Sequence, residues 1–342
     1  MSFSFKEILQ KITLGHDLSS SQAVYALECI MNGEVSSEEI ASFLTAMKMK
    51  GETVQELSSF VQVMRSKSLK VETDITGAVD IVGTGGDKSG TFNISTITAF
   101  VTAAAGVPVI KHGNRSASSK CGSADVLEIL GANIELHPDQ VAQVFERVGI
   151  AFMYAPMFHP AMKYVMPARK AIGFRTFFNI LGPLTNPAGV RNYVIGAYNK
   201  DVAHQMAQIL ATLDTQFAYT FSSEDGLDEI SLCNPTTFFE VKEQLSSQQR
   251  TFKPEELGFN RVEMTELIGG EPSLNARIFT DILANKATEA QTNMVVLNAA
   301  FAIHAVTDVQ NLQEAKILAE EAIQSGAALT KLNEFITATQ SC

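Results

Sequence analysis

The sequence predicts an α/β protein of two domains: a small all-helical domain, and a larger domain with a mainly parallel central sheet flanked by helices. Three observations support this class. The chain has 342 residues, enough to divide into two domains. Its N-terminal part has helical periodicity with readable helix caps. From residue 79 onward, short β-rich runs alternate with helices, a pattern typical of a parallel sheet covered by helices.

The helical domain is expected over residues 1–72. Two pairs of residues have capping-box spacing, Ser36 with Glu39 and Thr53 with Glu56. Because each pair satisfies N–H groups that a helix start leaves unbonded, helices are expected to begin there. Gly33 and Gly51 stand where a left-handed residue would end a helix.

The α/β domain is expected over residues 73–342. Strands are predicted at 79–82, 107–110, 150–154, 193–198 and 217–222. One segment, 156–188, breaks the alternation: it is helical in pattern, rich in Arg and Lys, and ends in Gly-Pro and Asn-Pro turns. We expect its helices, from about 160–185, to complete the helical domain.

Charge and composition exclude several classes of protein. The net charge of −11 and the isoelectric point of about 5.1 disfavour binding to nucleic acid or anionic membranes. No secretory signal and no apolar run long enough to span a membrane are apparent. Four cysteines lack Cys-x-x-Cys spacing, which disfavours a zinc site or a disulfide framework. We therefore expect a cytoplasmic protein with no nucleic-acid or membrane partner.

A first glycine-rich loop, GTGGD at 83–87, lies between a predicted strand and a helix predicted over 97–105. Glycines without a Cβ let backbone N–H groups approach an anion, and a helix N-terminus favours negative charge. Short polar side chains follow the loop in greater number than an N-cap requires: Thr91, Asn93, Ser95 and Thr96. This region predicts a phosphate site.

A second loop, KHGNRSASS at 111–119, follows a strand expected to end at Ile110. Its two cations, one amide and three hydroxyls are donors suited to a diphosphate. The two loops together predict a phosphorylated sugar as ligand.

Two further features suggest a metal and a second substrate. Asp228 and Glu229 are adjacent acids in a predicted loop, and Mg²⁺ prefers such oxygen ligands where it bridges diphosphate oxygens. Glu224 and Asp225 lie nearby and could also be metal ligands, but nothing in their spacing selects them. Arg169 lies in the basic segment 156–188 and is a candidate receptor for a carboxylate.

Eight motifs occur in order: GTGGD, TFNIST, KHGNRS, GSADVLE, HPAM, ARK, RTFFNILGPLTNPA and DGLDE. Together they make the chain resemble the anthranilate phosphoribosyltransferase family over nearly its whole length. The resemblance implies transfer of a 5-phosphoribosyl group from phosphoribosyl diphosphate to the amino group of anthranilate, the second step of tryptophan biosynthesis. It also implies Mg²⁺ as cofactor and a homodimer formed through the helical domain.

The resemblance also implies a set of site residues. Those for phosphoribosyl diphosphate are Gly83, Gly86, Asp87, Thr91, Asn93, Ile94, Ser95, Thr96, Lys111, His112, Gly113, Asn114, Arg115, Ser116, Ala117, Ser118, Ser119 and Ser123. Those for anthranilate are Gly83, Asn114, Arg169 and His159, and those for the metal are Ser95, Asp228 and Glu229. No acid or base is assigned, and Lys111, Asn114 and Arg169 are expected to act by positioning. Two departures from the family pattern are Lys88 and Cys121, where Gly and Ser are usual.

Two other functions remain open. A pyrimidine nucleoside phosphorylase shares the architecture, but KHGN, DGLDE and Arg169 favour the transferase. A non-catalytic, nucleic-acid-binding relative would require a basic surface and loss of the acid pair, and the sequence shows neither.

Overall fold

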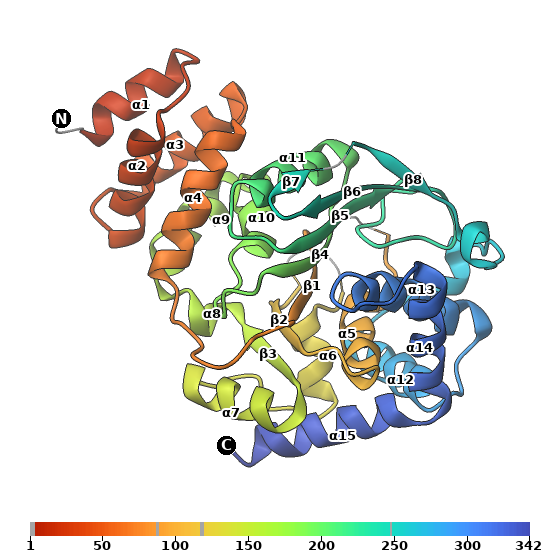
Figure 1. Ribbon diagram of the computed structural model, residues 1–342. Coiled ribbons are helices and arrows are strands. Elements are labelled where there is room, and N and C mark those ends of the chain that lie inside the picture. The colour runs from red at the N-terminus through yellow and green to blue at the C-terminus, as the bar shows by residue number, and fades with distance from the viewer. Residues whose placement is uncertain (1–3, 87–88, 117–119, 247) are drawn as a thin grey trace. The chain divides into compact units, whose positions relative to one another are not determined.

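The computed structural model describes residues 4–86, 89–116, 120–246 and 248–342. The chain folds into two compact units (Figure 1). Unit 1 consists of Met1–Lys70 and Phe158–Gly189, and unit 2 consists of Val71–Met157 and Val190–Cys342. The chain therefore leaves unit 1, forms the first half of unit 2, returns to unit 1 and then completes unit 2.

Unit 1 is helical. Its N-terminal helices are α1 (Phe5–Thr13), α2 (Ser20–Asn32), α3 (Ser37–Lys50) and α4 (Val54–Lys67). Both predicted capping boxes form, and in the first the Glu39 N–H donates to Ser36 Oγ over 3.2 Å. Gly33 ends α2 in the left-handed conformation as predicted. Gly51 follows α3 with φ 84° and ψ 125°, so it is not the left-handed cap that was expected.

The segment that returns to unit 1 is more broken than its sequence pattern predicts. Its short helical turns are α8 (Ala155–Phe158), η1 (Pro160–Tyr164), α9 (Met166–Ile172), α10 (Phe178–Leu181) and η2 (Gly182–Leu184). Prolines stand at the starts of η1, α9 and η2, because a residue without an N–H begins a helix more readily than it continues one. Phe177 joins this segment to the N-terminal helices, with its ring 4.7 Å from that of Phe60 and 6.2 Å from that of Phe43.

The described part of unit 2 contains an eight-stranded sheet with the order β3-β2-β1-β4-β5-β6-β7, and β8 also pairs with β6. Strands β1 to β5 pair in parallel and the remainder are antiparallel. The strands are β1 (Val79–Gly83), β2 (Val109–Gly113), β3 (Ile150–Tyr154), β4 (Asn192–Gly196), β5 (Phe217–Ser223), β6 (Thr236–Lys242), β7 (Leu245–Ser246) and β8 (Arg250–Phe252). The antiparallel strands β6 to β8 were not predicted from the sequence.

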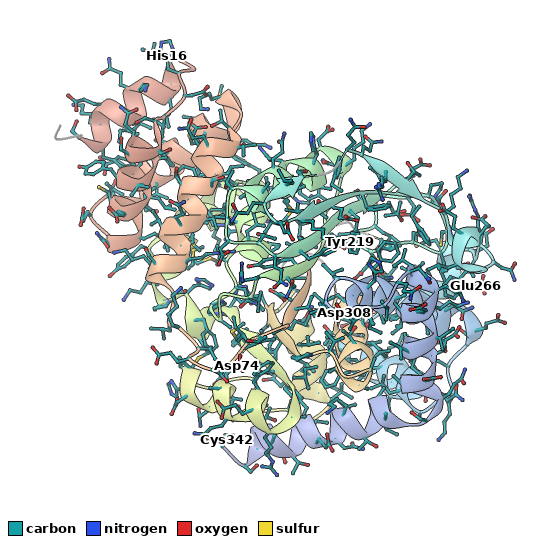
Figure 2. The ribbon with its side chains drawn as sticks, in the orientation of Figure 1. His16, Asp74, Tyr219, Glu266, Asp308 and Cys342 are labelled. Atoms are coloured by element: carbon teal, nitrogen blue, oxygen red, sulfur yellow. The ribbon has the colours of Figure 1, made fainter. Side chains whose placement is uncertain are left out.

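Helices cover this sheet. They are α5 (Ile94–Ala104), α6 (Ser123–Ile129), α7 (Pro138–Val148), α11 (Lys200–Ala211), α12 (Pro272–Leu283), α13 (Glu289–His304), α14 (Leu312–Gln324) and α15 (Ala327–Gln340), with η3 (Pro254–Leu257) and η4 (Met264–Leu267) between. Helix α5 packs against β1 and β2, and α11 packs against β5 and β6. Tyr219 of β5, labelled in Figure 2, hydrogen-bonds His304 Nδ1 of α13 over 2.9 Å. Among the described helices, none is both long and apolar enough to cross a membrane.

The direction of chain winding reverses between β1 and β4. From β1 the chain passes through α5 to β2 on one side, and from β4 it passes through α11 to β5 on the other. Such a reversal opens a crevice at the carboxyl ends of the two strands, where ligands of open α/β sheets bind. Gly83 and Gly196 are register partners at these ends, so they mark the floor of the crevice.

Candidate active site

The acid loop, Glu224–Ile230, lies directly on the crevice between β1 and β4. A Cβ added to Gly83 would lie 2.9 Å from Asp228 Cγ, and one added to Gly196 would lie 3.0 Å from Asp228 Cα and closer still to its carbonyl group. The Gly85 N–H donates to Asp228 Oδ2 over 2.6 Å. The two glycines thus make room for Asp228 beside the first phosphate loop. Gly196 was not predicted as a site residue, because no motif marks it.

The structure separates the acids of this loop by role. Asp225 accepts hydrogen bonds from the Leu227 N–H over 3.2 Å and from Ser231 Oγ over 2.6 Å, so its carboxylate holds the loop together. Asp228 and Glu229 are half-buried, and Glu224 is exposed. This favours Asp228 and Glu229 over their neighbours as the residues that face a ligand.

Lys111 lies inside strand β2, which corrects the expectation that a strand ends at Ile110 and leaves Lys111 in a loop. The lysine is 3% exposed, and its Nζ donates to the Ile81 carbonyl and, over 3.3 Å, to Ser95 Oγ. Burial lowers the pKa of Lys111, while Asp80, Glu229 and Asp228 act to raise it. Lys111 is therefore hydrogen-bonded to Ser95 on α5 and electrostatically attracted by the acid pair.

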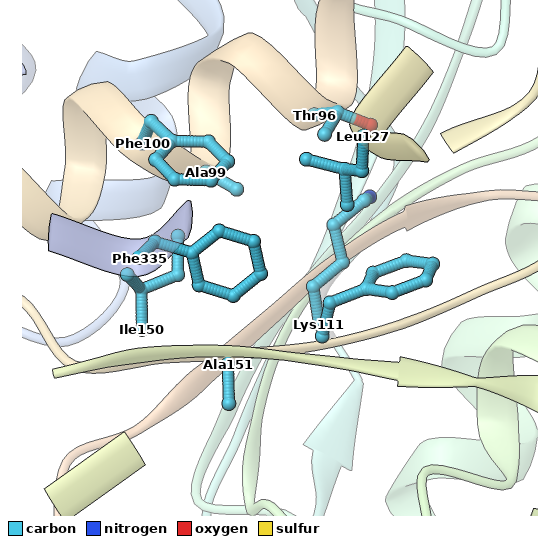
Figure 3. A pocket seen from close by; sticks show the side chains of 9 residues that line it. Thr96, Ala99, Phe100, Lys111, Leu127, Ile150, Ala151 and Phe335 are labelled. Carbon is cyan, nitrogen blue, oxygen red and sulfur yellow. The ribbon is translucent and has the colours of Figure 1, made fainter. Parts of the chain in front are cut away.

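Figure 3 shows the Lys111 side chain extending from β2 toward Thr96, with the apolar residues Ala99 and Phe335 also lining the cavity beside its stem. This cavity has a volume of about 10 Å³, room for one water molecule at most. It is therefore part of the packing beneath the site, and a substrate requires the open side at the strand ends.

Asp80 is a buried acid behind the site that no sequence motif marked as functional. It has no exposed surface, and its Oδ1 accepts a hydrogen bond from the His112 N–H over 3.1 Å. Together with the attraction to Lys111, this bond fixes the end of β2 relative to β1. His112 itself is 5% exposed.

The helices that follow the two predicted phosphate loops are hydrogen-bonded to each other. Thr96 Oγ1, in the first turn of α5, donates to Ser123 Oγ, at the start of α6, over 2.9 Å. Asn93 caps α5 by accepting from the Thr96 N–H over 3.3 Å, so the helix begins at Ile94 instead of the predicted Ile97. The helix N-terminus is thus nearer the glycines than expected.

Ile94 is a poor match to its predicted role. Its side chain is 1% exposed, and its N–H donates to the Phe92 carbonyl over 2.8 Å, so that N–H is not available to a ligand. Thr91 and Gly86 are half-buried beside the same loop, and direct contact by any of the three stays a prediction.

The second loop is braced by acids of α6. Asp125 accepts from the Ser116 N–H over 3.1 Å and from the Gly122 N–H over 2.8 Å. The Arg115 guanidinium forms ion pairs with Asp125 at 3.0 Å and Glu128 at 2.8 Å. A phosphate contact by Arg115 therefore requires it to exchange a carboxylate partner, and it stays a prediction.

The remaining predicted residues of the second loop keep their proposed roles as predictions. Asn114 is exposed and accepts from the Arg115 N–H over 2.7 Å, and Gly113 ends β2. Positions outside the described residues are Asp87, Lys88, Ala117, Ser118 and Ser119. Burial, Asp125 and Glu271 raise the pKa of Cys121 to about 12, so this departure from the family pattern places an unreactive thiol in the loop.

Arg169 and His159, predicted for anthranilate, belong to unit 1. The Arg169 guanidinium lies 5.5 Å from the centre of the Phe178 ring, and burial lowers its pKa. Burial and the nearby Lys70 lower the pKa of His159 to about 4, so this imidazole is neutral at pH 7.

The residues near the crevice have the donor chemistry for Mg²⁺. Asp228 and Glu229 supply carboxylates, and Ser95 supplies a hydroxyl within reach of the same lysine. Within the described residues no group of three or more His, Cys, Asp or Glu side chains forms a metal cage. A sparse set of oxygens suits Mg²⁺, which keeps several waters and takes substrate phosphates as ligands.

Comparisons with known proteins define the class to which this fold and site belong. A model of the glycosyl transferase family, a/b domain, matches residues 76–329, and a model of the glycosyl transferase family, helical bundle domain, matches residues 6–68. The chain belongs to this glycosyl transferase family.

Within that family the relatives are anthranilate phosphoribosyltransferases, and the chain belongs with them. The enzyme of Persephonella marina is 46% identical over 334 residues, 96% of this chain and 98% of its own. The structure of the Thermus thermophilus enzyme has a TM-score of 0.91 at 36% identity and covers 97% of this chain and 99% of its own. The Saccharomyces cerevisiae enzyme, in complex with PRPP and Mg, has a TM-score of 0.91 at 27% identity and covers 99% and 98%.

Proposed function

We propose that this protein transfers the 5-phosphoribosyl group of phosphoribosyl diphosphate to the amino nitrogen of anthranilate, giving N-(5-phosphoribosyl)anthranilate and diphosphate. The observation that carries the proposal is the assembly at one crevice of a buried cation, two acids and the N-terminus of α5. Lys111 lies on β2, the acids follow β5, and Ser95 lies on α5, so distant segments converge where α/β sheets bind ligands.

In the proposed reaction the anthranilate nitrogen bonds to C1 of the ribose as the bond from C1 to the diphosphate oxygen breaks. Positive charge develops on the sugar and negative charge on the leaving diphosphate. Lys111 Nζ and the N-terminal end of α5 stabilise the negative charge. The aryl amine is neutral at pH 7 and attacks without a strong base, then loses its proton to solvent. The protein acts mainly by holding the two reactants in line, which supplies roughly 7–11 kcal/mol in favourable systems.

Mg²⁺ dependence is part of the proposal. Asp228, Glu229 and Ser95 would hold the ion, which when bound would help to neutralise the diphosphate. The yeast relative, whose structure is a complex with PRPP and Mg, supports this assignment.

For anthranilate we propose Arg169 as the partner of the carboxylate. Its guanidinium stays charged even with a lowered pKa, and the Phe178 ring beside it orients its plane. Asn114 and Gly83, which belong to unit 2, remain proposed contacts. His159, neutral and buried, is proposed only to shape the site.

We also propose a homodimer through unit 1 and a cytoplasmic location. Leu14, directly after α1, and Met49, on α3, are 68% and 83% exposed, and an interface there would cover these apolar side chains. The four cysteines, all among the described residues, form no disulfide, which fits a reducing compartment. Sedimentation velocity tests the dimer, and a monomer at micromolar concentration would contradict it.

The decisive experiment follows the loss of anthranilate fluorescence on addition of phosphoribosyl diphosphate and Mg²⁺. Turnover must require all three components, and folded protein without turnover refutes the proposal. Phosphorolysis of uridine or thymidine by the same sample would instead favour the nucleoside phosphorylase. Lys111→Met should abolish measurable binding of phosphoribosyl diphosphate. Lys331→Met is the matched control, because Lys331 Nζ donates to the Val148 carbonyl, just before β3 and away from the site.

A further inference from the structure

Two buried asparagines on the C-terminal helices hold the backbones of the two loops that form the proposed site. Asn275 of α12 is 2% exposed, and Asn298 of α13 is 1% exposed. A buried carboxamide is costly unless its donors and its acceptor are bonded, and in both residues they are bonded to backbone groups.

Asn275 acts on the first phosphate loop. Its Oδ1 accepts from the Asn93 N–H over 2.8 Å, at the start of α5. Its Nδ2 donates to the Gly270 carbonyl over 2.6 Å and points toward that of Glu271 at 3.4 Å. Because a backbone N–H can only donate, the orientation of this amide is fixed by Asn93.

The segment that Asn275 grips, Leu267–Glu271, lies alongside the same loop. The Phe92 N–H donates to the Leu267 carbonyl over 3.0 Å, and the Gly269 N–H donates to the Gly90 carbonyl over 2.9 Å. A Cβ on Gly269 would lie 2.7 Å from the Phe92 nitrogen, so the two backbones are in close contact. Asn275 therefore fixes both the start of α5 and the strand-like segment that supports the loop before it.

Asn298 acts on the acid loop in the same manner. Its Oδ1 accepts from the Ile230 N–H over 3.0 Å, and its Nδ2 donates to the Ile230 carbonyl over 2.9 Å. Nδ2 also donates to the Met294 carbonyl over 2.9 Å, one turn earlier on its own helix. Ile230 directly follows Glu229, so this paired contact fixes the backbone next to the acid pair.

We propose that Asn275 and Asn298 are positioning residues of the site, Asn275 for the diphosphate loop and Asn298 for the acid pair. The proposal rests on the proposed function, because it takes the ligands of the two loops to be phosphoribosyl diphosphate and a divalent cation. A purely structural role predicts a loss of stability alone, whereas positioning predicts that each residue affects a different ligand.

The test uses Asn275→Asp and Asn298→Asp, which keep the shape of the side chain and its acceptor oxygen but lose the N–H donors. Asn275→Ala and Asn298→Ala are tested in parallel. Binding of phosphoribosyl diphosphate at saturating Mg²⁺ is measured by calorimetry, and binding of Mn²⁺ is measured by electron paramagnetic resonance. Asn275→Asp should weaken the binding of phosphoribosyl diphosphate about tenfold and leave the binding of Mn²⁺ within about twofold of the parental value. Asn298→Asp should weaken Mn²⁺ binding about tenfold. The dissociation constant of phosphoribosyl diphosphate at saturating Mg²⁺ should stay within about twofold of the parental value.

The control is Asn192→Asp. Asn192 is 3% exposed and donates from Nδ2 to the Ala78 carbonyl over 3.1 Å, at the amino ends of the strands. This variant should lower the melting temperature without changing either binding constant. Folded Asn275 and Asn298 variants with parental binding constants would overturn the inference. A parent protein that binds no phosphoribosyl diphosphate would instead refute the proposed function, and the inference with it.

Discussion

Gly196→Ala should displace the acid pair without replacing any side chain that is proposed to act in the reaction. Gly196 is buried at the end of β4, between Gly83 of β1 and Phe221 of β5, so the strand has no room to move. An added methyl group would lie 3.0 Å from Asp228 Cα and overlap its carbonyl group. Because non-bonded heavy atoms settle about 3.5 Å apart, the Asp228 backbone must move by more than about 1 Å.

The size of the effect follows from that displacement. A shift of about 1 Å at a reacting centre can lower the rate about 100-fold, and we expect a loss of this order in kcat/KM. Overpacking should also lower the free energy of unfolding by about 2 kcal/mol. Gly83→Ala should be milder, because the atom it approaches most closely belongs to the Asp228 carboxyl group, which can rotate, although the bond from the Gly85 N–H is then lost.

The assay is anthranilate fluorescence at varied Mg²⁺, together with urea denaturation. Gly149→Ala is the matched control: Gly149 ends α7 with φ 75°, and a Cβ there would meet no atom within 4 Å. The left-handed backbone should cost this variant about 1 kcal/mol of stability while its kinetic constants stay parental. A folded Gly196→Ala variant with parental kcat/KM and Mg²⁺ dependence would refute the reasoning.

Two further predictions concern unit 1. Since burial lowers the pKa of His159 from 6.5 to about 4, the unfolded chain binds more protons between these pH values, and stability falls as the pH is lowered through this window. Across it the parent should lose roughly 3 kcal/mol more of unfolding free energy than His159→Gln, and parallel pH profiles would disprove this. Glu56→Ala should cost about 3 kcal/mol in urea denaturation, because the fully buried carboxylate accepts from the Leu18 N–H over 2.8 Å and pairs with Lys50 at 2.9 Å, although Lys50 keeps a second ion pair. Glu39→Ala, at an exposed capping box, should cost far less, and equal losses would contradict the buried pair.

The parts of the fold that were predicted from the sequence are those that depend on residues close together in the chain. The capping boxes at Ser36 and Thr53 form, and the parallel strands from β1 to β5 occur near the predicted positions. Strands β6 to β8 were missed because alternation with helices favoured a mainly parallel sheet, and no strand was predicted after residue 222. The end of β2 was misplaced because a lysine in a buried strand is explained only by partners distant in sequence, namely Ile81, Ser95 and the acids.

In the site too, residues that belong to local motifs were predicted, and residues whose roles depend on distant partners were not. Glycines, hydroxyls and adjacent acids are visible as motifs, and the structure brings Ser95, Lys111, Asp228 and Gly83 together. Gly196, Asn275 and Asn298 were invisible because their roles depend on what lies against them. An isolated Gly at a strand end or an Asn in a helix has no local signature.

The glycine floor under Asp228 also bears on how the gene can change. Every single-base change in a glycine codon that alters the amino acid adds a side chain, and at Gly83 or Gly196 that side chain begins inside the volume of Asp228. Neighbouring aliphatic positions of the strands can exchange one branched residue for another and still fill the core. In a library of all single substitutions, these two codons should therefore stand out as intolerant, although neither encodes a side chain.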